Sequence, residues 1–443
     1  MSDITISQIP KYESYSATEI GWIGDIPTHW IVKKAKFLFN EVNERSIEGN
    51  EELLSVSHLT GVSRRSEKNV TMFQAEDYTG SKLCKPGDLV MNIMWAWMGA
   101  LGVSNLEGIV SPSYGVFRTK RPNEFNLKFL EYLLKTPKYI EHYNKVSTGL
   151  HSSRLRFYAD MFFDMKLGFP DFKEQNLIIE FLDKKTSQID EAIAIKQKQI
   201  ELLKERKQII IQQAVTQGLN PDVPVKDSGV DWIGDIPEHW DTKKLKFVSH
   251  GFMYGTSVDC NSLESGTPVL RIPNIDEITI NLSDLKYANL SSDETKKYSL
   301  SKNDILIIRT NGNPALVGKS AIVDADDLCL FASYLIKLTP KSNIEPSFLI
   351  HTMNSFSVRG ALTYSARTSA GNYNLNTQAL GDCHIAFPPR EEQIQIADFV
   401  DRVSAKTDQS LALVTEQIAK LKEYKNTLIN SAVTGKIKVT ELA

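Results

Sequence analysis

Apolar side chains recur at alternating spacings of four and three residues in two long stretches of the chain. This pattern repeats every seven residues and is typical of an α-helix that buries one stripe against a second helix. The first stretch carries the stripe residues Ile189, Ile193, Ile200, Leu203 and Ile210. The second carries Leu411, Val414, Ile418, Leu421 and Leu428, in the same register 218 positions further on. We therefore predict two long helices that pair with each other as a coiled coil.

Signals on either side of these stretches set the predicted domain boundaries. A Phe-Pro pair precedes each helix, and Gly218, Pro221 and Pro224 end the first one. The predicted order is a first globular domain at 1–172, a central helix at 173–217, a linker and second globular domain at 218–389, and a C-terminal helix at 390–443. Antiparallel pairing of the helices would place one domain at each end of a rod with a pseudo-two-fold axis. At 1.5 Å per residue, about 40 helical residues would make this rod about 60 Å long.

The globular parts show the shorter pattern of strands and turns. Segments 85–102 and 302–318 each begin with a turn and continue into apolar strands. One or two helices are expected in each domain. The predicted fold class is therefore α+β, with two mixed α/β domains separated by the long helices.

Two phrases occur twice in the chain. WIGDIP-x-HW begins at Trp22 and again at Trp232, 210 positions later, and KKAKF or KKLKF follows it. FPDFKEQ and FPPREEQ open the two long helices. The sequence between these phrases differs, so we predict a duplicated module with constant ends and a divergent middle. We interpret WIGDIP as an anchor of the chain onto its domain, and His29 and His239 as packing or capping groups.

Two lysines, Lys207 and Lys425, occupy matching positions within the apolar stripe of the two helices. The simpler interpretation is that their charged ends reach out to solvent near a frayed helix end. The alternative is that they fix the register or orientation of the helix pair.

Composition excludes several classes of protein. The net charge is −3, the hydrophobic fraction is 42%, and four cysteines are scattered without a paired spacing. A zinc site or disulfide framework is therefore not indicated, and a reducing cytoplasm is expected. The start of the chain does not read as a secretory signal, and no apolar run reaches the roughly 18 residues of a membrane span. Any nucleic-acid binding must come from local patches.

Such patches are visible in the divergent middles. No acidic residue occurs in 142–158, 309–323 or 357–375, although acids outnumber bases in the whole chain. These stretches are rich in Arg, Lys, Asn and Ser, which bind phosphates and base edges. Each stretch alone could be an ordinary surface loop. Trp95 and Trp97 could stack on bases, but in an apolar segment we interpret them as core.

We find no motif for catalysis. The phosphate-binding loop G-x-x-x-x-G-K-[ST], G-x-G-x-x-G, H-E-x-x-H and G-x-S-x-G are all absent from the sequence. Phe387-Pro388-Pro389-Arg390 is not the Asn-Pro-Pro-aromatic motif of an amino-methylating enzyme, and Pro170-Asp171 lacks a following Glu-x-Lys. A duplicated module without a reaction centre favours a recognition subunit.

The combination of these phrases resembles the specificity subunit of type I restriction-modification systems. WIGDIP-x-HW-x-x-K-K-x-K-F, its recurrence, the FP-x-x-x-EQ-x-x-I helix starts and the closing Ala-Val-Thr at 214–216 and 432–434 carry the resemblance. It extends over nearly the whole chain. The divergent middles would correspond to its target recognition domains.

The resemblance implies a function. Each recognition domain would read one half of a split double-stranded DNA target, and the coiled helices would set the spacer between the halves. Two methyltransferase subunits would dock on the constant regions and bring S-adenosylmethionine, and two restriction subunits would bring the ATP-driven nuclease with its Mg²⁺. The chain itself would hold no cofactor or metal, have no catalytic residue and need no membrane.

We expect readout in the major groove by side chains of the divergent middles. The first-domain candidates are Arg64, Arg65, Lys145, His151, Arg154 and Arg156. The second-domain candidates are Arg309, Asn311, Asn313, Lys319, Arg367 and Asn372. Two alternatives stay open: a non-catalytic coiled-coil scaffold with two protein-binding heads, and an autonomous methyltransferase or nuclease with an unfamiliar site.

Overall fold

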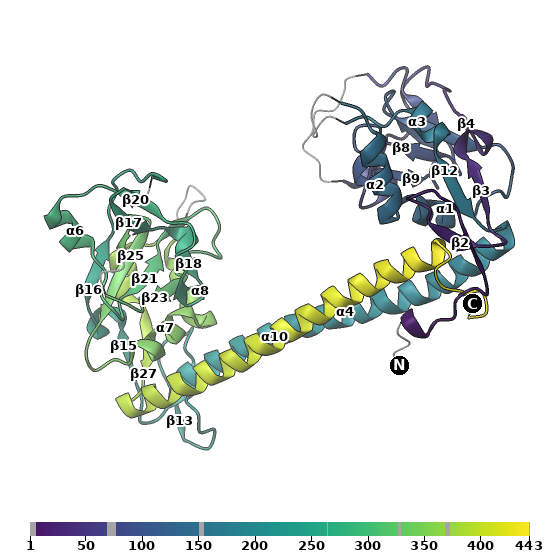
Figure 1. The fold of residues 1–443 in the computed structure, drawn as a ribbon. Helices are drawn as coiled ribbons and strands as arrows, with labels where there is room; N and C mark the ends of the chain where they lie inside the picture. Colours follow the sequence, from purple (N-terminus) through teal and green to yellow (C-terminus); the bar gives the residue numbers. More distant parts are fainter. Residues whose placement is uncertain are drawn as a thin grey trace. The chain divides into compact units, whose positions relative to one another are not determined.

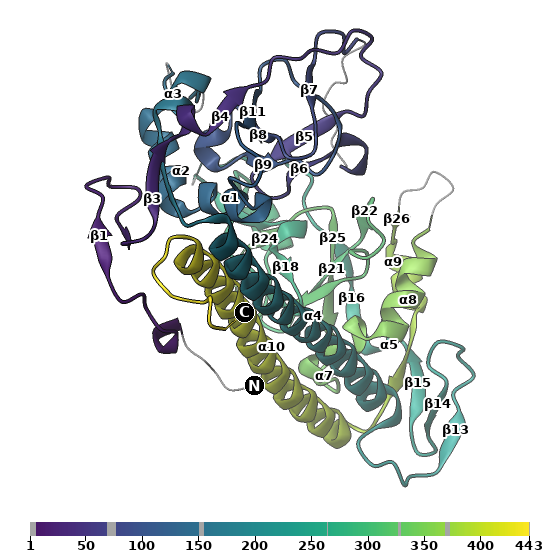
Figure 2. The same ribbon diagram turned by 90° about the vertical axis from the view of Figure 1, so that its right-hand side faces the viewer.

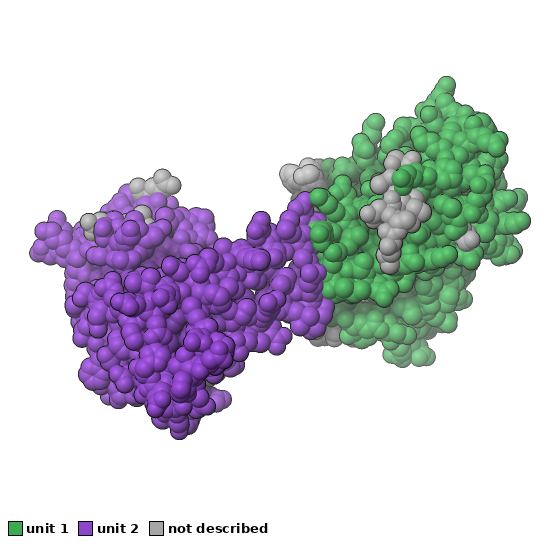
Figure 3. Space-filling view, turned by 90° about the horizontal axis from the view of Figure 1, so that it is seen from below, with its two compact units in different colours: residues 1–196, 417–443 green, residues 197–416 purple. Residues whose placement is uncertain are grey.

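The computed structural model describes residues 6–68, 77–149, 155–263, 265–326, 329–367 and 373–442, which form a mixed α and β fold. The chain divides into two compact units (Figure 3). Unit 1 comprises residues 1–196 and 417–443, and unit 2 comprises residues 197–416. Each predicted globular domain falls in a different unit, and the division cuts both long helices.

Short strands and three helices make up the globular part of unit 1. The strands are β1 (Tyr15–Ala17), β2 (Asp25–Pro27), β3 (Ile31–Lys34), β4 (Phe39–Glu41), β5 (Leu54–Ser57), β6 (Gly61–Arg64), β7 (Lys82–Cys84), β8 (Leu89–Met91), β9 (Leu101–Val103), β10 (Gly108–Val110), β11 (Gly115–Thr119) and β12 (Lys166–Phe169). The helices are α1 (Leu127–Leu134), α2 (Pro137–Val146) and α3 (Ala159–Asp164). Single 3-10 turns lie at η1 (Ile6–Gln8), η2 (Ala35–Phe37), η3 (Arg65–Glu67) and η4 (Ala96–Met98).

The globular part of unit 2 is built in the same style. Its strands are β13 (Val225–Asp227), β14 (Asp235–Pro237), β15 (Asp241–Lys244), β16 (Ser249–Tyr254), β17 (Thr267–Leu270), β18 (Ile275–Asp276), β19 (Thr279–Ile280), β20 (Lys286–Ala288), β21 (Ile305–Ile308), β22 (Thr310–Asn311), β23 (Ser320–Ile322), β24 (Leu330–Phe331), β25 (Leu335–Pro340), β26 (Tyr373–Asn374) and β27 (His384–Phe387). Its helices are α5 (Leu245–Val248), α6 (Ser292–Tyr298), α7 (Pro346–Asn354), α8 (Phe356–Ser365) and α9 (Thr377–Asp382), with a 3-10 turn at η6 (Ile272–Asn274).

Two long helices follow the two Phe-Pro pairs, as the pattern predicts: α4 (Phe172–Gln217) and α10 (Arg390–Val433). Within each unit their segments lie side by side (Figures 1 and 2). The stripe residues Ile189, Ile193, Val414, Ile418 and Leu428 are buried. The remaining stripe residues, Ile200, Leu203, Ile210, Leu411 and Leu421, are half-buried.

The two stripe lysines form ion pairs across the helices rather than reaching into solvent at a frayed end. In unit 1, Lys425 Nζ lies 2.7 and 2.6 Å from the two carboxylate oxygens of Asp190. In unit 2, Lys207 Nζ lies 2.8 and 3.0 Å from those of Asp408. The two pairs occupy matching positions, 218 residues apart. The solvent-reaching interpretation is therefore wrong, because each charge finds a partner on the adjacent helix.

Each unit contains a four-stranded antiparallel sheet with the same arrangement. The strand order is β4-β11-β8-β9 in unit 1 and β16-β25-β21-β23 in unit 2. Leu89 lies opposite Phe117 in the first sheet, and Ile305 lies opposite Leu338 in the second. The acid just before each central strand is buried: Asp88 is held by Arg118, and the Asp304 carboxylate accepts hydrogen bonds from its loop and from Thr339.

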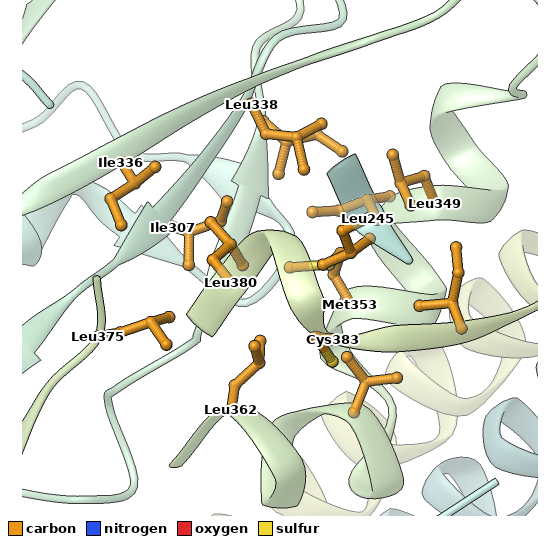
Figure 4. Close-up of a cluster of buried hydrophobic side chains, with 14 of the residues drawn as sticks. Leu245, Ile307, Ile336, Leu338, Leu349, Met353, Leu362, Leu375, Leu380 and Cys383 are labelled. Atoms are coloured by element: carbon orange, nitrogen blue, oxygen red, sulfur yellow. The ribbon is translucent and has the colours of Figure 1, made fainter. Parts of the chain in front are cut away.

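Apolar residues that point off these sheets form the cores. In unit 1, Val90 and Val116 pack with Val42, Leu54 and Val110. In unit 2, the strand residues Ile305, Ile307, Ile336 and Leu338 meet the helices α7, α8 and α9, as Figure 4 shows for Leu349, Leu362 and Leu380. Burial of large aliphatic side chains, at about 1.5–3 kcal/mol each, supplies most of the stabilisation.

The duplicated WIGDIP phrases anchor each chain entry to the start of a long helix. Trp22 Nε1 donates to the Lys166 carbonyl in β12, and Trp232 Nε1 donates to the His384 carbonyl in β27, both at 3.2 Å. The anchor interpretation is thereby confirmed for both tryptophans. Strands β3 and β12 pair in unit 1, and β15 and β27 pair in unit 2, so each constant phrase closes its unit.

A glutamate in the first turns of each long helix completes the anchor. Glu174 accepts hydrogen bonds from Tyr12 at 2.7 Å and Trp30 Nε1 at 3.2 Å, and lies 2.7 Å from His29 Nε2. Glu392 lies 2.7 Å from His239 Nε2 and accepts from Trp240 Nε1 at 3.0 Å. Each histidine therefore bonds to the glutamate in the first turns of its long helix.

The opposite end of each long helix also meets a WIGDIP phrase. Gly218, just after α4, has φ +77° and a Cβ there would lie 3.2 Å from the Trp240 ring. Gly435, just after α10, has φ +71° and a Cβ would lie 2.5 Å from Pro27. The left-handed backbone disfavours a side chain at both positions, and at Gly435 there is also no space for one.

Candidate nucleic-acid interface

The structure brings the acid-free stretches of unit 2 together on one surface. Strand β22, from the first stretch, pairs with β26, from the second: Thr310 lies opposite Asn374 and Asn311 opposite Tyr373 (Figure 2). The Leu375 amide then donates to the Arg309 carbonyl at 2.7 Å. No acidic residue occurs from 305 to 323 or from 346 to 381. The combined surface therefore favours a polyanion.

The Arg309 side chain holds the β22–β26 strand pair in place. Its guanidinium lies 4.3 Å from the ring centroid of Tyr254, and its Nη2 donates to Asn374 Oδ1 at 2.8 Å. The side chain is half-buried, and its Nε is buried without a hydrogen-bond partner among the described residues. Tyr254 in turn accepts a hydrogen bond from the Thr377 amide at 3.0 Å. Arg309 thus links β16 to the β22–β26 strand pair that the acid-free stretches form.

The loop after β22 is ordered by its own asparagines and by a second arginine. Asn311 Oδ1 accepts from the Asn313 amide at 2.8 Å, and Asn313 Oδ1 accepts from the Ala315 amide at 3.0 Å. Arg359 of α8 donates from Nη2 to the Ala315 carbonyl at 2.6 Å. Burial of the Arg359 guanidinium lowers its pKa, since desolvation disfavours the charged form. Lys319 donates to the Ile275 carbonyl at 3.0 Å.

A groove of about 650 Å³ runs beside this loop along α8. Phe356 and Tyr364 flank it, and each is 80% exposed. Arg367 lies exposed in the same lining, next to Tyr373. An open groove with aromatic rings and arginines in an acid-free surface can bind a sugar–phosphate chain.

Unit 1 brings its own divergent stretches together in the equivalent place. The Phe157 amide donates to the Ile93 carbonyl at 2.9 Å, which matches the Leu375 bond in unit 2. Thr148 and Arg156 exchange backbone hydrogen bonds at 3.0 and 2.8 Å. Residues 89–106 and 142–159 contain no acid. Lys145 lies exposed on α2 beside this surface.

A tight turn interrupts the apolar strands predicted for 85–102. Strand β8 ends at Met91, the turn η4 follows, and β9 begins at Leu101. Trp95 is 47% exposed and Met98 is 40% exposed, so the interpretation of Trp95 as a core residue is wrong. The turn lifts Trp95 off the sheet, whereas a continued strand would have alternated it into the core. Trp97 is half-buried.

Among the other first-domain candidates, Arg64 ends strand β6 and Arg65 begins the turn η3. Arg65 stands close enough to Tyr114 for its charge to oppose the burial that raises the Tyr114 pKa. Tyr114 accepts a hydrogen bond at 2.9 Å from Asn92, which follows strand β8. Arg64 is exposed and pairs with Glu67 at 3.2 Å. His151, Arg154 and Asn372 lie outside the described residues.

Several residues of the two surfaces were not among the sequence candidates. Tyr254, Phe356, Tyr364 and Asn374 are brought to the unit 2 surface only by the fold. Arg359 was visible as a base in an acid-free stretch, and that composition was its only signal. No motif marks the aromatic residues, because exposure is decided by packing.

The described residues contain no group of three or more His, Cys, Asp or Glu side chains placed to hold a metal ion. Across the part of the chain that the structure describes, the helices are all too short or too polar to cross a membrane.

Comparison with known proteins gives a uniform result. Residues 237–422 match the family model of the type I restriction modification DNA specificity domain. The chain is 26% identical to the type I restriction enzyme StySPI specificity subunit of Salmonella potsdam, over 68% of this chain and 66% of that protein. It is 23% identical to the EcoKI specificity subunit of Escherichia coli K12, over 81% of this chain and 76% of that protein.

Another relative, from Methanocaldococcus jannaschii, carries the name of a type I restriction enzyme MjaX specificity subunit. It is 28% identical over 46% of this chain, and the match spans about half (47%) of its length.

Solved structures give the same fold. The chain matches a structure described under complex assembly and conformational transition of the type I R-M system with a TM-score of 0.68, at 14% identity, over 92% of this chain and 98% of that one. It matches the crystal structure of the HsdS subunit from Thermoanaerobacter tengcongensis with a TM-score of 0.53, at 14% identity, over 93% of this chain and 98% of that one. The resemblance in the sequence is confirmed: residues 237–422 match the specificity-domain model, and the relatives that the chain resembles are named as type I restriction enzyme specificity subunits.

Proposed function

We propose that this chain selects the DNA target of a type I restriction-modification complex. Each globular part acts as a target recognition domain that reads one half of a bipartite double-stranded sequence. The observation that carries the proposal is the pair of acid-free surfaces. In both units they are assembled by matching backbone bonds, from Phe157 to Ile93 and from Leu375 to Arg309.

We further propose that α4 and α10 form an antiparallel coiled coil within a pseudo-two-fold internal repeat, and that its length sets the spacer between the half-targets. Burial of the stripe residues and the matching pairs Lys425–Asp190 and Lys207–Asp408 support this. The shared sheet orders and the two glutamate anchors support the repeat. Removing one heptad from both helices would shorten the rod by about 10 Å, or roughly 3 base pairs.

Two methyltransferase subunits are the proposed partners on the constant regions, with two restriction subunits joining them. Ile195 of α4 and Leu413 of α10 occupy matching positions 218 residues apart, and they are 63% and 53% exposed. The repetition of an exposed apolar residue at the same position of both helices supports one docking position on each helix. S-adenosylmethionine, ATP and Mg²⁺ would be held by these partners, and this chain would carry out no chemistry.

The test is an exchange of residues 40–168 for the corresponding segment of a relative with a different target. Methylated adenines are then mapped in cells that contain the chimaera and its methyltransferase. Only one half of the target should change, because only one surface has been replaced. A change in both halves would contradict the modular reading.

The salt dependence of DNA binding distinguishes the proposed function from a protein-binding scaffold. The assembled complex should lose specific DNA affinity steeply as salt rises, since each neutralised phosphate releases counterions. Salt-independent association, or no DNA binding by the complex, would favour a scaffold with protein-binding heads. S-adenosylmethionine binding or DNA cleavage by the purified chain would favour an autonomous enzyme.

A further inference from the structure

The turn between β8 and β9 carries two large apolar side chains that are exposed at the surface of unit 1. Trp95 is 47% exposed and Met98 is 40% exposed. Tyr158, from the stretch that packs beside the turn, is 46% exposed. Exposing such groups together costs free energy that contact with a partner would recover.

The turn is rigid, so these side chains cannot easily fold away. The amides of Met98 and Ala100 both donate to the Trp95 carbonyl, at 2.9 and 3.1 Å, and the Trp95 amide donates to Asn92 at 2.9 Å. Gly99 has φ +82°, and a Cβ there would lie 3.0 Å from Ile140 of α2. The turn is therefore fixed both by its own hydrogen bonds and by close packing on α2.

The two tryptophans have different roles. Trp97 Nε1 donates to the Met94 carbonyl at 2.9 Å, so its polar group is used within the turn. Its ring stacks against Trp95, with centroids 5.9 Å apart and planes inclined by 27°. Trp97 supports one side of Trp95, and the exposed part of Trp95 remains available for contact.

The surroundings indicate a nucleic acid rather than an apolar protein surface. The turn lies in the acid-free run 89–106 and packs on α2, whose last turn carries the exposed Lys145. It occupies the position that Asn311 and Asn313 occupy in unit 2, between matching strands of the two sheets. An apolar group set in a cation-bearing surface suits a ligand that offers both phosphates and an apolar edge.

Within an intact duplex, the faces of the bases are stacked and unavailable. The apolar group that the major groove does expose is the C5-methyl of thymine. We propose that Trp95 and Met98 contact thymine methyl groups in the half-target read by unit 1, and so select A·T pairs there. This inference rests on the proposed function, and it adds which base pair the surface of unit 1 recognises.

The test uses the assembled complex with its methyltransferase subunits and a target already defined by methylation mapping. Each thymine of the half read by unit 1 is replaced singly by deoxyuridine, which removes only the methyl group. The dissociation constant should rise about fourfold at one or two positions, as a buried methyl is worth about 0.8 kcal/mol and 1.4 kcal/mol is tenfold. Deoxyuridine in the half read by unit 2 serves as the internal control.

Variants assign the effect to the turn. Trp95→Ala or Met98→Ala should bring the thymine-to-uracil preference at the affected position toward one, while binding of uracil duplexes stays nearly unchanged. Ile47→Ala is the matched control, because Ile47 is also an exposed large apolar residue of unit 1, at 87%, and lies between β4 and β5. It should leave the preference intact.

Each outcome decides between readings. The inference is overturned if the half-target read by unit 1 contains no thymine, or if deoxyuridine does not change its binding. In either case a split target would still support the proposed function. Tighter binding to duplexes with an unpaired base would overturn it in favour of a stacking wedge. Loss of methyltransferase association in Trp95→Ala would overturn it in favour of protein docking. If no split target is found at all, the proposed function itself fails.

Discussion

The two units share a four-stranded sheet but differ in the segment that follows its central strand. Both have the same sheet order, and in both a divergent segment donates a backbone N–H hydrogen bond to a carbonyl just after a central strand. Unit 1 fills the connection after that strand with a turn that exposes Trp95 and Met98. In unit 2 the connection contains β22 and a polar loop, and Arg309 at its start bonds to Asn374 of β26. Backbone hydrogen bonds thus preserve the shared sheet while side chains at one edge are free to diverge.

The anchors to the long helices differ in the same manner. Glu174 has three partners and its side chain is 14% exposed, whereas Glu392 has two partners and is 35% exposed. One helical turn or more further on, Asp183 pairs with the exposed Lys128, whereas Asp401 pairs with His351, which is 2% exposed. The same junction is therefore built with different degrees of burial.

The largest predicted effect concerns the glutamate anchors. Glu174→Ala should lower the free energy of unfolding by about 2–4 kcal/mol, because it leaves the Tyr12 hydroxyl and the Trp30 N–H without their acceptor. Glu392→Ala should cost about 1–2 kcal/mol, since water can reach that site. Chemical denaturation of both variants checks this, with Glu391→Ala as a control at an adjacent helix position. Equal losses of unfolding free energy in the two variants would contradict the proposed effect of burial.

The next effect concerns Arg309, which holds the β22–β26 strand pair. Arg309→Ala should reduce discrimination at the half-target read by unit 2 by about tenfold, because the ring stack and the Asn374 bond together are worth about 1–2 kcal/mol. Arg309→Lys should recover only part of it, since an ammonium group cannot stack and bond in the same geometry. Methylation rates on single-base variants of the target measure the effect. Asn92→Ala, at the matching corner of unit 1, should alter the other half, and a loss in both halves would indicate general unfolding.

A smaller effect depends on pH. The hydrogen bond from His351 holds the pKa of Asp401 below its ordinary value of 3.8. Because the folded-state pKa is lowered, the carboxylate stabilises the fold above pH 4, and this contribution is lost as the pH falls through the lowered pKa. Asp401→Asn should therefore cost about 1 kcal/mol at pH 7 and progressively less below pH 4. Asp183→Asn, in the exposed pair of unit 1, should show a smaller cost, and a larger one would contradict the comparison.

The smallest effect concerns the lysines of the helix stripe. Lys207→Ala and Lys425→Ala should each cost about 0.5 kcal/mol, because their aspartate partners are more than half exposed and screened by solvent. The exchange Lys207→Asp with Asp408→Lys should restore stability relative to Lys207→Asp alone. A double-mutant cycle in denaturant measures the coupling, and no restoration would rule out a role in helix register.

Periodicity and repetition were sufficient to predict several parts of this molecule. The heptad pattern located α4 and α10, and the repeated WIGDIP phrases indicated two anchors, now seen in the bonds of Trp22 and Trp232. Acid-free composition pointed to the segments that meet at the two surfaces. These features are local in sequence, or recur at a fixed offset, so they need no knowledge of long-range contacts.

The long-range contacts are what the tertiary structure decided. Pairing of β22 with β26, the position of Tyr254 under Arg309 and the exposure of Trp95 each depend on residues far apart in the chain or on a turn that breaks an apolar run. Composition cannot distinguish a tryptophan in a strand from one lifted out by a 3-10 turn, because the same residue suits both. By itself, the sequence determined which segments are helical and which segments match. Only packing determined which side chains face outward, since burial is a property of the assembled fold and not of any one segment.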